Sequence, residues 1–284
     1  MKNKIYLYLE LMRFNRPIGI FLLLWPTLWA LWLASLGHPS TKHIFIFILG
    51  VIIMRSAGCV INDIADRKFD LFVKRTQHRP LTSGKINLKE AIGVFIFLCF
   101  IALGLVLCLN PFAIALSLVG LFLAILYPFT KRVSYFPQFF LGLAFAWAVP
   151  LVYAATMQSL PFEAWLVFLA ALLWPVAYDT FYAMTDKNED LKIGIFSTAI
   201  KWGDSVKIFI FFIYIIFFII LFWVGYLYHL KNRYFVGLVI AMLVAFYQFW
   251  IVRNNSIESY FRAFLNNNAI GFIIFLSILV NYYL

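Results

Sequence analysis

Two short stretches, residues 61–70 and 178–190, hold seven of the twelve acidic residues of this chain. Each contains two aspartates four residues apart: Asp66 with Asp70, and Asp186 with Asp190. On a helix, residues at i and i+4 share one face, with Cβ atoms about 5–6 Å apart. Two carboxylates held that close repel each other unless a cation lies between them. The spacing therefore predicts a cation-binding function for both stretches.

The residue types around these pairs indicate which cation. Neither stretch contains His or Cys, and Asn62 extends the first face by one turn. Oxygen ligands without nitrogen or sulfur favour Mg²⁺ over zinc or copper. Mg²⁺ bound by one or two carboxylates completes its shell with water and substrate phosphate. We predict that the metal ligands are Asn62, Asp66, Asp70, Asp186 and Asp190.

A simpler interpretation is that these acids are solvated helix ends. One such pair alone would fit that interpretation better than a metal site. Two pairs in a chain with so few acids favour the metal site. Asp179 adds weight, because it lies more than a turn inside an apolar run, where an acid is costly and is functional by default.

Long apolar segments must position these groups. The chain is 64% hydrophobic and 12% charged, whereas soluble domains are about 45–50% apolar and about 25% charged. Its apolar runs are near the roughly 20 residues that span a bilayer, and they do not alternate as barrel strands do. They cover residues 18–36, 43–62, 91–109, 111–129, 135–157, 162–184, 208–229, 234–252 and 268–284. We expect an all-α integral membrane protein with nine transmembrane helices, forming one domain over residues 1–284.

The distribution of Lys and Arg predicts the orientation. With nine spans, 19 of the 23 basic residues share the side of the N-terminus, and three lie opposite. Basic residues concentrate on the cytoplasmic side, so the N-terminus and both acidic stretches are predicted to be cytoplasmic and the C-terminus periplasmic. Loops at about 63–90 and 185–207 are long enough to cap a site. No signal or transit peptide is visible, which favours a bacterial inner membrane.

Basic residues accompany the acids on this side. Arg79 follows the second span, and Lys131 and Arg132 close the fourth. Arg binds phosphate bidentately and Lys acts as a point charge. The positive-inside pattern alone explains many such residues, but it does not explain Arg55, which lies within a span. Metal, bases and an apolar bundle together predict a cytoplasm-side cavity for a polyprenyl diphosphate.

Other classes of function are disfavoured. We attribute the net charge of +11 to loops that face anionic membrane lipid and to an anionic substrate, and not to nucleic acid. Three cysteines, Cys59, Cys99 and Cys108, lie in apolar runs without the spacing of a zinc site. No separate soluble domain or long linker is present, and we expect no obligatory protein partner.

Several motifs resemble the UbiA prenyltransferase superfamily. They are Arg16-Pro17-Ile18-Gly19, the segment from Met54 to Asp63, Arg79-Pro80-Leu81, Tyr178-Asp179-Thr180, and the segment from Ile193 to Ala199. The resemblance extends from residue 13 to about 203 and is strongest to the branch that prenylates 4-hydroxybenzoate in ubiquinone biosynthesis. It implies nine helices around a central cavity, two aspartate-rich motifs capped by cytoplasmic loops, Mg²⁺ dependence, and polyprenyl diphosphate and 4-hydroxybenzoate as substrates.

The resemblance also implies roles for single residues. The first motif matches at Asn62, Asp66 and Asp70, and the second at Asp186 and Asp190, with Glu189 where the family often has Asp. The positions implicated in diphosphate binding are Arg16, Arg79, Lys131 and Arg132. Arg55 resembles the position that meets the acceptor carboxylate, and Tyr178 and Asp179 belong to the same pocket.

The implied reaction has three parts. Metal and bases stabilise the departing diphosphate, an allylic cation forms away from water, and the ring carbon ortho to the phenol attacks it. The predicted catalytic residues are Asp66, Asp70, Asp179, Asp186 and Asp190, and either Asp179 or Asp186 activates the phenol. Two alternatives remain: another acceptor, such as a naphthoate, homogentisate or haem, or an ion-coupled transporter. A transporter usually places its charged site near the membrane midplane, whereas these acids gather at one interface.

Overall fold

The computed structural model describes residues 4–73 and 75–284, and every regular element in these ranges is a helix. Residues 1–3, in the predicted cytoplasmic N-terminus, and Lys74, in the predicted cap loop 63–90, lie outside the described residues. The α-helices are α1 Lys4–Leu11, α2 Ile18–Ala34, α3 Thr41–Asp66, α4 Leu88–Val106, α5 Pro111–Thr130, α6 Pro137–Ala146, α7 Ala148–Met157, α8 Phe162–Ile193, α9 Thr198–Trp202, α10 Val206–Leu227, α11 Asn232–Ile251 and α12 Ile257–Tyr283. Two short 3₁₀ helices are η1 Gly203–Ser205 and η2 Val252–Asn254.

Each of the nine predicted spans corresponds to one helix or to consecutive helices. Over the described ranges, eight helical stretches are long and apolar enough to cross a membrane, and the apolar α2 is slightly shorter, at 17 residues. Three of the eight stretches contain more than one helix. They are α6 with α7, α9 with α10, and α11 with η2. The predicted all-α membrane fold with nine spans is confirmed.

Side-chain caps begin several of these spans. Ser40 accepts a hydrogen bond from the first turn of α3, and Asn110 does the same for α5. The Asn87 side chain accepts a hydrogen bond from the backbone N–H of Glu90 at 2.8 Å, and the Glu90 carboxylate accepts one from the Asn87 backbone N–H at 2.9 Å. Such caps satisfy N–H groups that the start of a helix leaves unpaired, so the polar residues between apolar runs fix where each span starts.

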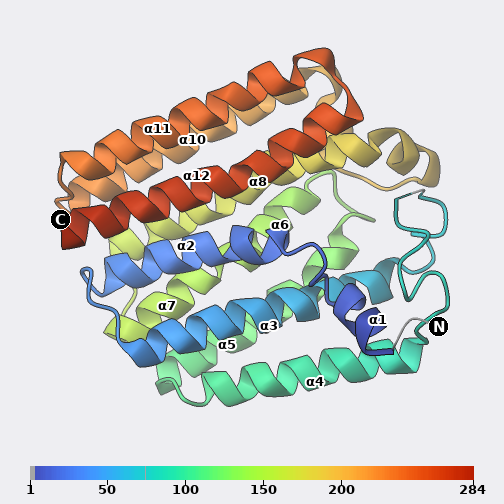
Figure 1. The fold of residues 1–284 in the computed structure, drawn as a ribbon, viewed down its shortest axis with the longest axis horizontal. Helices are drawn as coiled ribbons and strands as arrows, with labels where there is room; N and C mark the ends of the chain where they lie inside the picture. The colour runs from blue at the N-terminus through green and yellow to red at the C-terminus, as the bar shows by residue number, and fades with distance from the viewer. Residues whose placement is uncertain (1–3, 74) are drawn as a thin grey trace.

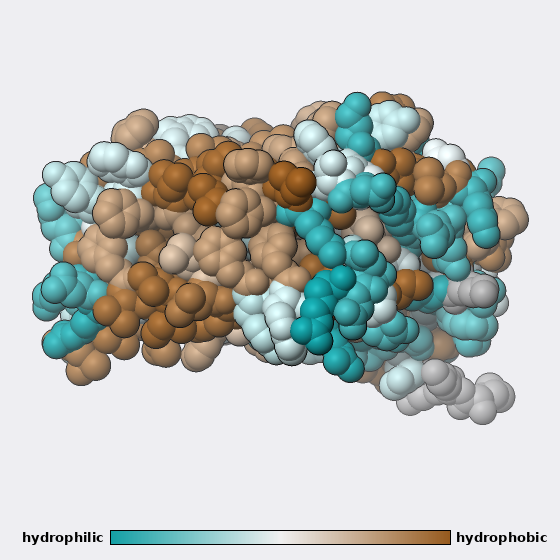
Figure 2. Space-filling view, turned by 90° about the horizontal axis from the view of Figure 1, so that it is seen from above, coloured by the Kyte–Doolittle hydropathy of each residue, from teal (hydrophilic) through white to brown (hydrophobic). Residues whose placement is uncertain are grey.

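The spans lie alongside one another, and the two chain ends are at opposite ends of the bundle, as an odd number of crossings requires (Figure 1). The end that holds α1 also holds the segment 67–87 and α9 (Figure 1). Figure 2 shows a broad hydrophobic flank and a concentration of hydrophilic residues toward that same end. The polar groups predicted to form a site therefore gather at one end of an apolar bundle.

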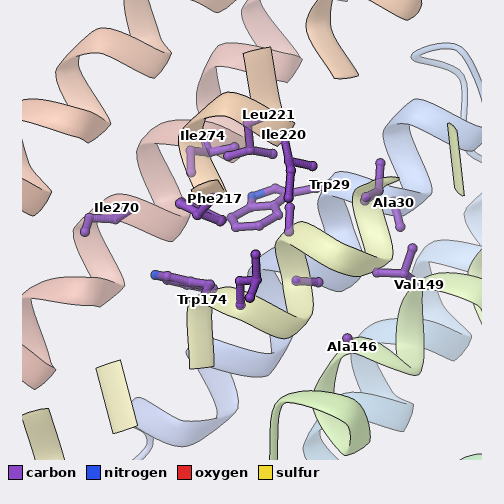
Figure 3. Packing of buried hydrophobic residues seen from close by; sticks show 14 of the residues in the cluster. Trp29, Ala30, Ala146, Val149, Trp174, Phe217, Ile220, Leu221, Ile270 and Ile274 are labelled. Atoms are coloured by element: carbon purple, nitrogen blue, oxygen red, sulfur yellow. The ribbon is translucent and has the colours of Figure 1, made fainter. Parts of the chain in front are cut away.

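The main core lies where α2, α8, α10 and α12 meet. Trp29, Trp174 and Phe217 pack together there, with the Trp29 and Trp174 ring centroids 5.3 Å apart (Figure 3). The Trp29 indole donates to Gly271 O at 3.1 Å. Between α2 and α12 these contacts join segments about 240 residues apart in sequence, so they hold the first span against the last.

Three helices end or break elsewhere than the apolar runs suggest. Helix α8 continues to Ile193, nine residues past its apolar run, and therefore carries Asp186 and Asp190 on its last turns. Helix α12 begins at Ile257, where Ser256 caps it, and continues through the buried Asn267, whose side chain accepts hydrogen bonds from Trp174 and Tyr214 at 3.0 and 2.8 Å. The fifth predicted span is interrupted at Trp147, where Pro150 has no N–H to offer to the carbonyl of residue 146.

Close packing of α6 against α8 depends on Gly142. A Cβ at this position would lie 2.4 Å from the Leu172 carbonyl oxygen. We expect Gly142→Ala to lower the stability by about 1–3 kcal/mol, the usual cost of overpacking. The melting temperature of the detergent-solubilised protein should fall, whereas Gly104→Ala, with open space around its Cβ, should leave it unchanged. Equal melting temperatures for the two variants would contradict this account of the helix contact.

Candidate active site

A cavity of about 1000 Å³ lies inside the bundle. This volume is at the upper end of the roughly 300–1,000 Å³ typical of ligand sites. Charged and polar residues at one end of it are Arg13, Arg16, Asn62, Asp63, Arg75 and Arg79, and apolar residues of its wall include Leu22, Val51, Val106, Leu121 and Leu151. The predicted central cavity is confirmed, and its shape suits a ligand with an anionic head and an apolar tail.

Three buried aspartates stand at the end of α3 and in the turn that follows. Asp63, Asp66 and Asp70 are each at most 6% exposed. Asp63 accepts two hydrogen bonds from Arg13 Nη2, at 2.8 and 2.9 Å. Arg79 Nη1 donates both to Asp63, at 3.1 Å, and to Asp70, at 2.7 Å. Arg79 therefore joins two of the three carboxylates and fixes the turn that carries Asp70.

Asp66 has a different environment. Its carboxylate forms an ion pair with Lys131, and Arg132 Nη2 lies 3.7 Å from its Oδ1 atom. Arg132 also donates to the Ala65 carbonyl at 2.5 Å. The Oδ1 atom of Asp66 is buried and has no hydrogen-bond partner. A buried carboxylate oxygen without a hydrogen-bond partner is energetically costly. A ligand that binds this oxygen would remove that cost.

Burial raises the pKa of Asp70. The neighbouring carboxylates of Asp63 and Asp66 raise it further, whereas Arg79 and Lys131 lower it. The net upward shift means that the ionised form of Asp70 is less favourable here than it would be in water. A divalent cation near these aspartates would favour ionisation, so the electrostatics fit a metal site.

The second acidic stretch is tied to the first through the segment 67–87. Arg75 donates to Asp186 from Nε at 3.1 Å and from Nη2 at 2.5 Å, and its guanidinium lies 4.9 Å from the centre of the Tyr182 ring. Asp190 follows one turn later on α8, near Asp186 and Lys131. Segments more than 100 residues apart in sequence thereby meet at one end of the bundle.

In residues 4–73 and 75–284, no group of three or more His, Cys, Asp or Glu side chains is close enough to bind a metal as it stands. Basic side chains hold three of the aspartates predicted as metal ligands: Arg79 at Asp70, Lys131 at Asp66 and Arg75 at Asp186. For both stretches to bind one metal ion, some of these aspartates must therefore leave their Arg or Lys partner and bind the metal instead.

A second polar group lies deeper in the cavity. Arg55 donates from Nη1 to Cys59 Sγ at 2.9 Å and lies 5.6 Å from the centre of the Phe145 ring. Its Nε atom and the Tyr178 hydroxyl are buried without hydrogen-bond partners. Asp179 lies near both, and its carboxylate interacts with the Gln138 side chain. Unpaired donors in a buried pocket are suited to an anionic ligand.

The structure divides the predicted site residues into two sets. Those that line the cavity are Arg16, Arg55, Asn62, Arg79, Tyr178 and Asp179. Those that lie outside its lining, around its charged end, are Asp66, Asp70, Lys131, Arg132, Asp186 and Asp190. The first set can contact a ligand in the cavity directly, and the second lies around the charged end of the cavity.

Sequence reasoning missed three residues of this site. Tyr127 lines the cavity near Arg55, and Gln138 links Asp179 to the backbone N–H of Thr198, which donates to Gln138 at 3.0 Å. Cys59 is the thiol that holds Arg55. A Gln in an apolar run was a signal for Gln138, but nothing in the spacing separated Tyr127 or Cys59 from ordinary packing residues.

Comparisons with known proteins identify the family. Residues 23–278 match the UbiA prenyltransferase family. The 4-hydroxybenzoate octaprenyltransferase of Nitrosococcus oceani is 51% identical over 282 residues, which cover 99% of each chain. A solved UbiA homologue from Aeropyrum pernix K1 has a TM-score of 0.81 at 24% identity, over 92% of this chain and 97% of that one. Another, from Archaeoglobus fulgidus and bound to DMAPP and Mg²⁺, has a TM-score of 0.69 at 18% identity, over 94% and 98%. These two structures share the fold, and the full-length match together with the family motifs establishes that this chain belongs to the UbiA prenyltransferase family.

Proposed function

We propose that this protein transfers a polyprenyl group from polyprenyl diphosphate to the 3-position of 4-hydroxybenzoate, a step of ubiquinone biosynthesis in the bacterial inner membrane. The observation that carries the proposal is the cavity, with a charged end, a buried arginine and an apolar wall. The name of the Nitrosococcus oceani relative supports the choice of acceptor. A carbon–carbon bond forms at the ring, the carbon–oxygen bond to diphosphate breaks, and diphosphate and a proton are released.

A divalent metal fits the aspartate groups. Asp66 offers a buried oxygen without a hydrogen-bond partner, and Asp70 is a neighbouring carboxylate whose pKa is raised by burial. Such oxygen ligands suit Mg²⁺, and the homologue solved with DMAPP and Mg²⁺ supports this choice. The residues that would hold the ion are Asn62, Asp66, Asp70, Asp186 and Asp190. When bound, Mg²⁺ stabilises the negative charge of the departing diphosphate.

Basic residues bind the diphosphate. Arg16 and Arg79 line the charged end of the cavity, and each guanidinium can make two parallel hydrogen bonds to a phosphate. Lys131 and Arg132, at the end of α5, add positive charge beside Asp66. Their combined field stabilises the leaving group without further rearrangement of solvent.

The inner pocket orients the acceptor. Arg55 lines the cavity and pairs with the carboxylate of 4-hydroxybenzoate. Asp179 removes the phenol proton, because it lines the cavity, whereas Asp186 lies outside the lining and is bound by Arg75. Phe145 and Tyr178 present aromatic rings to the cavity, and such rings stabilise a cation. The apolar wall excludes water that would otherwise capture the allylic cation.

The charged end faces the cytoplasm in this proposal. The N-terminus, the segment 67–87 and the end of α8 are then cytoplasmic, and the C-terminus is periplasmic. The excess of Lys and Arg at this end supports that orientation.

Transfer should depend on Mg²⁺ and on the acceptor. Membranes that contain the protein, supplied with polyprenyl diphosphate, 4-hydroxybenzoate and Mg²⁺, should form 3-polyprenyl-4-hydroxybenzoate, detected by mass spectrometry. EDTA should abolish the product, and added Mg²⁺ should restore it. If homogentisate or a naphthoate gave a prenylated product and 4-hydroxybenzoate did not, the proposed acceptor would be wrong. Absence of transfer to any acceptor, with ion-coupled uptake instead, would refute the prenyltransferase activity.

A further inference from the structure

The guanidinium of Arg55 lies against α2 at a point where that helix has no side chain. A Cβ built on Gly19 would lie 2.4 Å from Arg55 Nε, 2.6 Å from Nη2 and 2.8 Å from Cζ. Real Cβ atoms essentially never approach other atoms so closely. Gly19 lies in the first turn of α2, where Ala would form helix more readily than Gly. The helix itself therefore does not require glycine here, and the space that glycine leaves is occupied by Arg55.

A second residue holds the same head group from its own helix. Cys59 stands one turn after Arg55 on α3 and accepts a hydrogen bond from Nη1 at 2.9 Å. Sulfur is a weak acceptor, so this contact orients the guanidinium without neutralising it. An arginine within a membrane span usually pairs with an acid or with backbone carbonyls. Here Nη1 has a buried thiol as its hydrogen-bond partner, Asp179 lies nearby, and Nε has no hydrogen-bond partner.

We infer that Gly19 and Cys59 are positioning residues for Arg55. Glycine admits the guanidinium against α2, and the thiol fixes its rotation, so that the guanidinium is held in the wall of the cavity that all three residues line. The ligand class is a carboxylate on an aromatic ring. This inference rests on the proposed function, in which Arg55 anchors the carboxylate of the acceptor.

Gly19→Ala should act on one substrate only. We expect kcat/KM for 4-hydroxybenzoate to fall by about 10–100-fold, the cost of misplacing a binding group by about 1 Å. The KM for polyprenyl diphosphate should stay within about two-fold, a difference worth about 0.4 kcal/mol. The matched control is Gly93→Ala on α4, which meets open space and lies outside the cavity lining. Equal losses for both substrates would show that Gly19 has a merely structural role.

A double-mutant cycle tests the contact itself. Alanine at residue 55 lacks every atom beyond Cβ, including the Nε, Nη2 and Cζ atoms that a Cβ on residue 19 would meet. In an Arg55→Ala background, Gly19→Ala should therefore add less than a two-fold loss, although Arg55→Ala is itself impaired. Contacting residues show such non-additivity, and independent residues do not. The same fold-loss in both backgrounds would overturn the inference.

Two substitutions of Cys59, one conservative and one not, test its contact with Arg55. Cys59→Ser keeps an acceptor for Nη1 and should retain KM for 4-hydroxybenzoate, whereas Cys59→Ala removes it and should raise that KM several-fold. Equal KM values for the two variants would remove Cys59 from the inference. These two Cys59 variants still test the positioning of Arg55 if the Gly19→Ala protein does not fold in detergent.

A binding measurement separates this inference from the proposed function. Benzoate binding to the wild type, Gly19→Ala and Gly93→Ala proteins, followed by calorimetry, needs no turnover. Weaker benzoate binding by Gly19→Ala alone supports the inference even if no prenyl transfer to 4-hydroxybenzoate is found, a result that would refute only the proposed function. A wild type that transfers prenyl groups, with Gly19→Ala unchanged in both KM and benzoate binding, would refute only the inference.

Discussion

Replacement of Asp66 by Asn should reduce kcat by about 10²–10³-fold, the usual cost of removing one group that stabilises developing charge. Asp66 is 1% exposed, carries an unpartnered carboxylate oxygen and is ion-paired with Lys131. Asparagine preserves the size of the side chain but removes the charge that a metal needs. It also leaves Lys131 without its buried partner, so part of the loss reflects a displaced lysine.

The measurement for Asp66→Asn is the initial rate of prenyl transfer across a range of Mg²⁺ concentrations. We expect a lower maximal rate and a higher Mg²⁺ requirement. The control is Asp204→Asn, an exposed position outside the cavity lining, which should keep the rate within about two-fold. An Asp66→Asn protein with normal kcat and normal Mg²⁺ dependence would exclude Asp66 from the metal site.

Replacement of Arg79 by Ala should impair both stability and substrate binding. Arg79 donates to Asp63 and Asp70, which are 1% and 6% exposed. Removal of one partner of a buried ion pair costs about 3–5 kcal/mol, although Asp63 keeps its two hydrogen bonds from Arg13. Because Arg79 also lines the cavity, we expect kcat/KM for polyprenyl diphosphate to fall about 10²-fold.

Thermal unfolding and steady-state kinetics separate these two effects of Arg79. Arg79→Lys keeps the positive charge but not the two-pronged geometry, so it should recover stability better than substrate affinity. Arg253→Ala, at an exposed arginine outside the cavity lining, is the control for loss of a surface charge and should be close to the wild type. An Arg79→Ala protein with an unchanged melting temperature and unchanged kcat/KM would contradict both roles.

The amino-acid sequence by itself determined the fold class and the spans. Within a bilayer an apolar run of about 20 residues satisfies its backbone polar groups only as a helix or in a closed barrel, and continuous hydrophobicity excludes the barrel. Residue types and spacing were also enough to propose Asn62, Asp66, Asp70, Asp186 and Asp190 as metal ligands, because i and i+4 are neighbours on any helix.

Only the tertiary structure decided which base holds which acid. Arg13 at Asp63, Arg75 at Asp186 and Lys131 at Asp66 are pairings across 50, 111 and 65 residues. No local spacing distinguishes these arginines and lysines from others on the same side of the membrane, since their positions depend on how α3, α5 and α8 pack. The same reason hid the contact between Gly19 and Arg55: a glycine is visible in a sequence, but the side chain that fills its space belongs to another helix.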